Sequence, residues 1–89
     1  MVRYRYRLHG RVQGVGFRYK ASHVADMYRL TGYVKNEYDD SVTLELQGKE
    51  EEIDMFFQLM SRDRYIVIDC MEKEKLPVDE HEGSFRVKY

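Results

Sequence analysis

The stretch GRVQGVGFR, residues 10–18, decides the fold because it joins two different hydrophobic periodicities. Before it, residues 2–9 alternate strictly between apolar and basic side chains, which predicts a half-buried strand. After it, Phe17, Ala21 and Val24 begin a helical spacing that predicts a helix over residues 18–29. The glycines in between allow the main chain to bend so that several amides converge at the helix start. Such a turn favours an anion, and above all a phosphate.

The segment after this helix has the pattern of a hairpin. We predict that Thr31 and Gly32 break the helix. Residues 33–37 and 41–47 then form two strands, joined by a short turn through residues 38–40. The apolar residues of the second strand alternate, so one of its faces points into a core.

The second half of the chain repeats a helix and a strand. Residues 49–60 carry three successive glutamates in their first turn, which suit the positive end of a helix dipole, and then an apolar stripe. Residues 65–72 are rich in β-branched side chains and predict a fourth strand. After a polar bend that contains Pro77, the alternation in residues 85–89 predicts a short terminal strand.

This order of elements predicts an α+β fold of the ferredoxin-like, split βαβ type. Two helices then cover one face of an antiparallel sheet, and the whole chain, residues 1–89, forms a single domain. In that topology the first and third strands are neighbours. The arginines of the first strand then share the open face with Glu45, and we expect them to be structural.

The composition of the chain limits the cellular location and the binding partners that we expect. With 15 basic and 16 acidic residues the net charge is −1, so no general attraction to nucleic acid or to a membrane is expected. Cys70 is the single cysteine and no apolar signal segment follows Met1, which favours a reducing, cytoplasmic location. The three histidines do not recur at ligand spacing, so we expect no metal and no cofactor. We expect a monomer.

Two polar residues are the candidates for chemistry. Arg18 stands at the helix start, where its planar guanidinium can grip two oxygens of a phosphate. Asn36 lies near the end of the second strand, and its carboxamide can both donate and accept hydrogen bonds, so it can orient a water molecule.

The chain resembles the acylphosphatase family over its whole length. The likeness rests on GRVQGVGFR (residues 10–18), on GYVKN (residues 32–36) and on the hairpin at residues 39–42. The resemblance implies an enzyme that hydrolyses the carboxyl-phosphate bond of a small acyl phosphate, without metal or covalent intermediate, to a carboxylate and inorganic phosphate. The phosphate is then both product and competitive inhibitor.

The resemblance also assigns residues. The phosphate-binding arginine of the family corresponds to Arg18 and its water-orienting asparagine to Asn36. The substrate-binding positions it implies are Gln13, Gly14, Val15, Gly16, Phe17 and Arg18. Arg29 and Asp40 stand where the family commonly has glycine, so we expect each to adopt a left-handed backbone at some cost in stability.

Two other functions fit parts of this sequence. Eight tyrosines and a ferredoxin-like sheet are also typical of RNA-recognition modules, which stack bases on open-face aromatics. Strand alternation places Tyr4 and Tyr6 on the core face with Leu8, so that face offers no stacking platform. A catalytically silent ferredoxin-like module that binds an anion or another small molecule remains the alternative.

Overall fold

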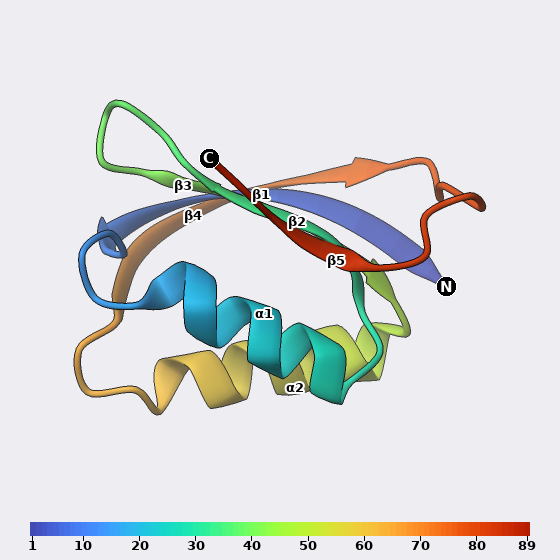
Figure 1. Ribbon diagram of the computed structural model, residues 1–89, viewed down its shortest axis with the longest axis horizontal. Helices are drawn as coiled ribbons and strands as arrows, with labels where there is room; N and C mark the ends of the chain where they lie inside the picture. Colours follow the sequence, from blue (N-terminus) through green and yellow to red (C-terminus); the bar gives the residue numbers. More distant parts are fainter.

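The five strands of the protein form one sheet in the order β4-β1-β3-β2-β5, and both helices pack on the same face of it (Figure 1). The computed structural model describes residues 1–89. No helix has the length and apolar character needed to cross a membrane. The elements are β1 (Val2–Arg11), α1 (Phe17–Met27), β2 (Thr31–Asn36), β3 (Val42–Gly48), α2 (Glu50–Ser61), β4 (Val67–Leu76) and β5 (Phe85–Lys88).

The split βαβ arrangement is confirmed, and the last strand makes the sheet mixed. β1 lies between β3 and β4 and is antiparallel to both, as β2 is to β3. β5 instead pairs in parallel with β2. The reason is that β4 already runs opposite to β2, and the chain reverses once more after Pro77 before it forms β5.

The core lies between the sheet and the helices. It consists of 17 buried apolar side chains, among them Tyr6 and Leu8 from β1 and Phe17 and Ala21 from α1. The alternation of β1 places its tyrosines inward, as predicted. Each large apolar side chain buried here stabilises the fold by roughly 1.5–3 kcal/mol relative to leaving it exposed.

The predicted helix break at Thr31 and Gly32 is wrong. Both residues belong to β2, and α1 already ends at Met27. The chain reverses at Arg29, whose φ of 56° confirms the expected left-handed backbone. Gly32 is needed for a different reason: a Cβ there would collide with the main-chain carbonyl of Glu45 on β3. The glycine therefore marks a close approach of two strands rather than a helix end.

The sheet face opposite the helices is only partly open. Arg3 is 7% exposed and Glu45 is 5% exposed, because residues 77–84 cross that end of the sheet. Arg3 donates from Nη2 to Glu45 Oε1 (2.7 Å) and from Nη1 to Glu82 Oε1 (2.6 Å). Arg5 donates from Nε to the other oxygen of Glu45 (2.9 Å). The structural role expected for these arginines is confirmed, although Arg3 is more deeply buried than an open face would allow.

Candidate active site

A cavity of about 350 Å³ lies where the turn of residues 12–16, the start of α1 and the ends of β2 and β5 meet. Arg18 and Asn36, which are 18 positions apart in the sequence, both line it. β1 and β2 run in the same direction, because both are antiparallel to β3. The turn that follows β1 and the last residue of β2 therefore lie at the same end of the sheet, which brings Arg18 and Asn36 together. The residues that line the cavity are Gly14, Gly16, Phe17, Arg18, Tyr19, Ser22, Asn36, Val87 and Tyr89.

The turn presents free amides to this cavity. Gly14 and Gly16 have φ values of 71° and 78°, a left-handed backbone that favours glycine. The amides of residues 14–19 donate no hydrogen bond to any protein group. A concave row of unpaired N–H groups at a helix start is suited to an anion.

The two helices differ in the charge of their first turns. α2 has Glu50, Glu51 and Glu52 in its first turn, where their charges complement the helix dipole. α1 has no acidic residue in its first turn, and its N-cap, Gly16, has no side chain to cap the amides. The positive end of α1 is therefore left uncompensated within the protein, and it faces the cavity.

Arg18 adds a full positive charge at that helix end. Its guanidinium forms no ion pair and no hydrogen bond with another side chain. Its contact is with the ring of Tyr89, whose centroid lies 4.6 Å from Cζ. Stacking on a ring leaves the N–H edges of a guanidinium free to bind oxygen atoms.

Asn36 carries an unusual polar atom. Its Oδ1 is shielded from solvent and accepts no hydrogen bond within the protein. Leaving a buried acceptor unpaired costs about 1–3 kcal/mol, and the only other such side-chain atom in the protein is Thr31 Oγ1. The side chain of Asn36 nevertheless reaches the same cavity as Arg18.

The predicted binding loop divides into two groups. Gly14, Gly16 and Phe17 line the cavity, whereas Gln13 and Val15 do not. The Val15 side chain packs against the core. The Gln13 side chain turns toward the β2–β3 hairpin, where its Nε2 donates to two main-chain carbonyls.

Sequence reasoning missed four lining residues: Tyr19, Ser22, Val87 and Tyr89. Helical spacing gave a signal for Ser22, which lies one turn after Arg18 on α1. Nothing in the sequence placed Val87 and Tyr89, because their position depends on the parallel pairing of β5 with β2.

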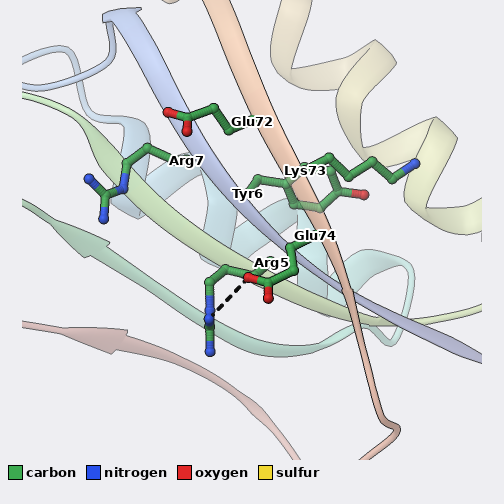
Figure 2. Close-up of a pocket in the computed structure, with 6 residues that line it drawn as sticks. All are labelled: Arg5, Tyr6, Arg7, Glu72, Lys73 and Glu74. Atoms are coloured by element: carbon green, nitrogen blue, oxygen red, sulfur yellow. Dashed lines mark hydrogen bonds and ion pairs between the residues drawn. The ribbon is translucent and has the colours of Figure 1, made fainter.

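A second hollow, of about 410 Å³, lies between β1 and β4 and is lined mainly by charged residues (Figure 2). Figure 2 shows the Arg5 guanidinium paired with Glu74, at 3.3 Å between Nη1 and Oε1. Arg7 lies opposite Glu72 in the strand register. Arg5 is paired with acidic side chains and Arg7 lies 3.8 Å from Asp39 Oδ2, whereas Lys73 Nζ lies over the ring of Tyr4. The two arginines of this hollow therefore differ from Arg18, which has no acidic partner. No three His, Cys, Asp or Glu side chains are grouped to hold a metal ion.

Comparison with known proteins shows which family the chain is similar to. The family model "Acylphosphatase" matches residues 4–87. An acylphosphatase of Clostridium acetobutylicum is 39% identical, over 100% of this chain and 99% of the relative. One from Geobacillus thermodenitrificans is 40% identical, over 90% and 86%. The crystal structure of acylphosphatase from Bacillus subtilis superposes with a TM-score of 0.89 at 31% identity and covers 100% of both chains.

The fold and the cavity define a small α+β protein with a cavity at the start of its first helix, lined by the turn glycines, Arg18 and Asn36. With the agreement of sequence and structure over the whole chain, the protein belongs to the acylphosphatase family. It is accordingly an enzyme of this hydrolase family.

Proposed function

We propose that Arg18 and the amides of residues 14–18 bind the phosphoryl group of an acyl phosphate while Asn36 orients the attacking water. The observation that carries this proposal is that Arg18, Asn36 and the glycines of the turn line one cavity. The products are a carboxylate and inorganic phosphate. Because the phosphate keeps the contacts of the phosphoryl group, it acts as a competitive inhibitor.

The chemistry explains why so few residues suffice. The water oxygen forms a bond to phosphorus as the bond from phosphorus to the acyl oxygen breaks, and that electron pair leaves with the carboxylate. A carboxylate is a good leaving group and needs no proton, so a general acid is dispensable. A loose phosphoryl-transfer transition state then requires mainly alignment and positive charge. A phosphate oxygen of the substrate takes the proton of the water.

The proposal also covers the cellular location and the oligomeric state of the protein. Cys70 is an exposed free thiol, which suits a reducing cytoplasm. Glu72 and Glu74 lie on one face of the edge strand β4, and Lys73 and Lys75 lie on the other. A symmetric antiparallel pairing of two copies centred on this segment would place like charges opposite each other. We therefore propose a cytoplasmic monomer.

The test is hydrolysis of a generic aryl acyl phosphate by the purified protein in the presence of a chelator. We expect turnover that is unaffected by the chelator and is inhibited competitively by added inorganic phosphate. Protein that binds phosphate but releases no carboxylate would contradict the proposal and would support the silent binding module. Turnover that fails in the chelator and returns with added metal would contradict the proposed mechanism.

A further inference from the structure

Gln13 connects two parts of the proposed site without lining the cavity. Its Nε2 donates to the main-chain carbonyl of Glu37 (2.8 Å) and to that of Ser41 (2.8 Å). Gln13 directly precedes Gly14 of the phosphate-binding turn, and Glu37 directly follows Asn36. One side chain therefore joins the turn that would hold the phosphoryl group to the strand end that would hold the water.

The hairpin that receives these hydrogen bonds is itself well fixed. The amide of Glu37 donates to the carbonyl of Ser41 (2.9 Å), and the hydroxyl of Thr43 donates to the Glu37 carboxylate (2.6 Å). The amide of Ser41 donates to Oδ1 of Asp39 (3.0 Å). Gln13 thus binds to a rigid feature rather than to a loose loop, so it can transmit a defined position to the turn.

We infer that Gln13 is a positioning residue that holds the phosphate-binding turn in register with Asn36. This inference rests on the proposed function. In-line attack requires the water and the phosphorus to be aligned, and a displacement of about 1 Å can cost about a hundredfold in rate. Phosphate binding itself needs only the turn and Arg18, which are continuous in the chain. Loss of Gln13 should therefore affect kcat more than phosphate affinity.

A structural role must be told apart from a positioning role, and Gln47 provides the matched control. Its carboxamide also bonds to main chain, accepting from the amide of Asp79 (2.7 Å) and donating to its carbonyl (2.9 Å). Gln47 lies at the other end of β3 from the cavity, opposite Arg3. Gln47→Met removes these two hydrogen bonds and a third, which Gln47 Oε1 accepts from Arg3 Nη1 (3.2 Å), all of them away from the site.

The experiment measures kcat, KM, the inhibition constant of inorganic phosphate and the unfolding midpoint for Gln13→Met and Gln47→Met. We expect both variants to lose stability. Gln13→Met should lower kcat by about ten- to a hundredfold, with the phosphate inhibition constant changed by less than about threefold. Gln47→Met should retain kcat within about twofold. Gln13→Met with unchanged kcat, or with kcat reduced only as much as in Gln47→Met, would overturn the inference.

A double-mutant cycle with Asn36→Ala tests the link itself. If Gln13 acts by aligning the turn with Asn36, Gln13→Met should lower kcat no further once Asn36 is absent. If the fold-reduction of kcat in the double variant equals the product of the reductions in the two single variants, the link is refuted.

A readout without turnover separates this inference from the proposed function. In the native protein, inorganic phosphate should shift the side-chain amide resonances of Asn36 in an NMR spectrum, and Gln13→Met should change the size or direction of that shift. Native protein that lacks turnover but shows this pattern would refute the proposed function and keep the role of Gln13. A shift that is unchanged in Gln13→Met would overturn that role.

Discussion

At the scale of single residues, the main feature is a cation in an electrostatically unfavourable place. Arg18 lies in the first turn of α1, where the positive end of the helix dipole already points, and no carboxylate neutralises either charge. A phosphate in the cavity would relieve both. The solvent-shielded, unpaired Oδ1 of Asn36 is a second local cost in free energy.

Arg18→Lys keeps the positive charge and loses the planar fork. Because a single well-placed donor to a transition state contributes about a hundredfold in rate, kcat/KM for an acyl phosphate should fall by about a hundredfold or more. Arg64→Lys is the control, since Arg64 also stacks on a ring, that of Tyr65, at 5.4 Å and away from the cavity. Near-native turnover of Arg18→Lys would exclude the clamp role.

Asn36→Ala should separate activity from stability. It removes the water-orienting group, so kcat should fall about a hundredfold while the inhibition constant of phosphate stays close to the native value. It also removes a buried acceptor that has no partner, so the free energy of unfolding should not decrease. Steady-state kinetics and urea unfolding check the two halves, and full activity would exclude the role of Asn36.

At the scale of elements, two connections between secondary-structure elements contain backbone strain, and neither strained position contributes to the site. Arg29, after α1, has a φ of 56°, and Asp40, in the β2–β3 turn, has a φ of 72°. A left-handed backbone costs most residues roughly 1–2 kcal/mol, and aspartate tolerates it better than arginine does. Both residues are exposed and neither lines the cavity.

Arg29→Gly should therefore stabilise the fold. The relief of strain exceeds the extra chain entropy of glycine, so the free energy of unfolding should rise by up to about 1 kcal/mol, or by several degrees in Tm. The matched control is Arg62→Gly at the end of α2, where φ is −76°. Glycine brings no relief there, so this variant should lose about 0.5–1 kcal/mol. Calorimetry distinguishes them, and a decrease for Arg29→Gly would contradict the strain argument.

At the scale of the whole molecule, a buried charge network ties the two ends of the chain to the sheet. Arg3 in β1 binds Glu45 in β3 and Glu82 in the segment before β5. This network holds residues 77–84 against the end of the sheet that lies away from the cavity. Burial would raise the pKa of Glu45, but hydrogen bonds from Arg5 and Arg3 outweigh it and lower that pKa below its ordinary 4.5.

The lowered pKa of Glu45 predicts acid sensitivity. A carboxylate with a depressed folded pKa stabilises the native state above its ordinary pKa, and this contribution is lost as the pH falls through the folded value. Stability should therefore decline below about pH 4.5. Glu45→Gln should be less stable at pH 7 and show a weaker decline, because it has no charge to lose. Urea midpoints from pH 7 to pH 3 check this, and parallel curves for the two proteins would contradict it.

Local patterns allowed much of this molecule to be predicted. The alternation of β1, the helical stripe after Phe17 and the glycines of the turn depend on neighbours in the chain, so they identified the fold class. They also placed Arg18 at a helix start. The ends of the elements depend on tertiary pairing: β4 extends to Leu76, beyond the predicted end at residue 72, through a charged segment of weak strand propensity, because the long β1 is available to pair with it.

The sequence by itself determined the elements and the two polar residues of the candidate site, because those signals act over one or two turns or along a single strand. Only the tertiary structure decided that Tyr89 stacks on Arg18, that Gln13 binds carbonyls up to 28 positions away, and that Gly32 serves a close strand approach. These contacts depend on which strands become neighbours. That choice depends on the burial of the whole core, which no local pattern contains.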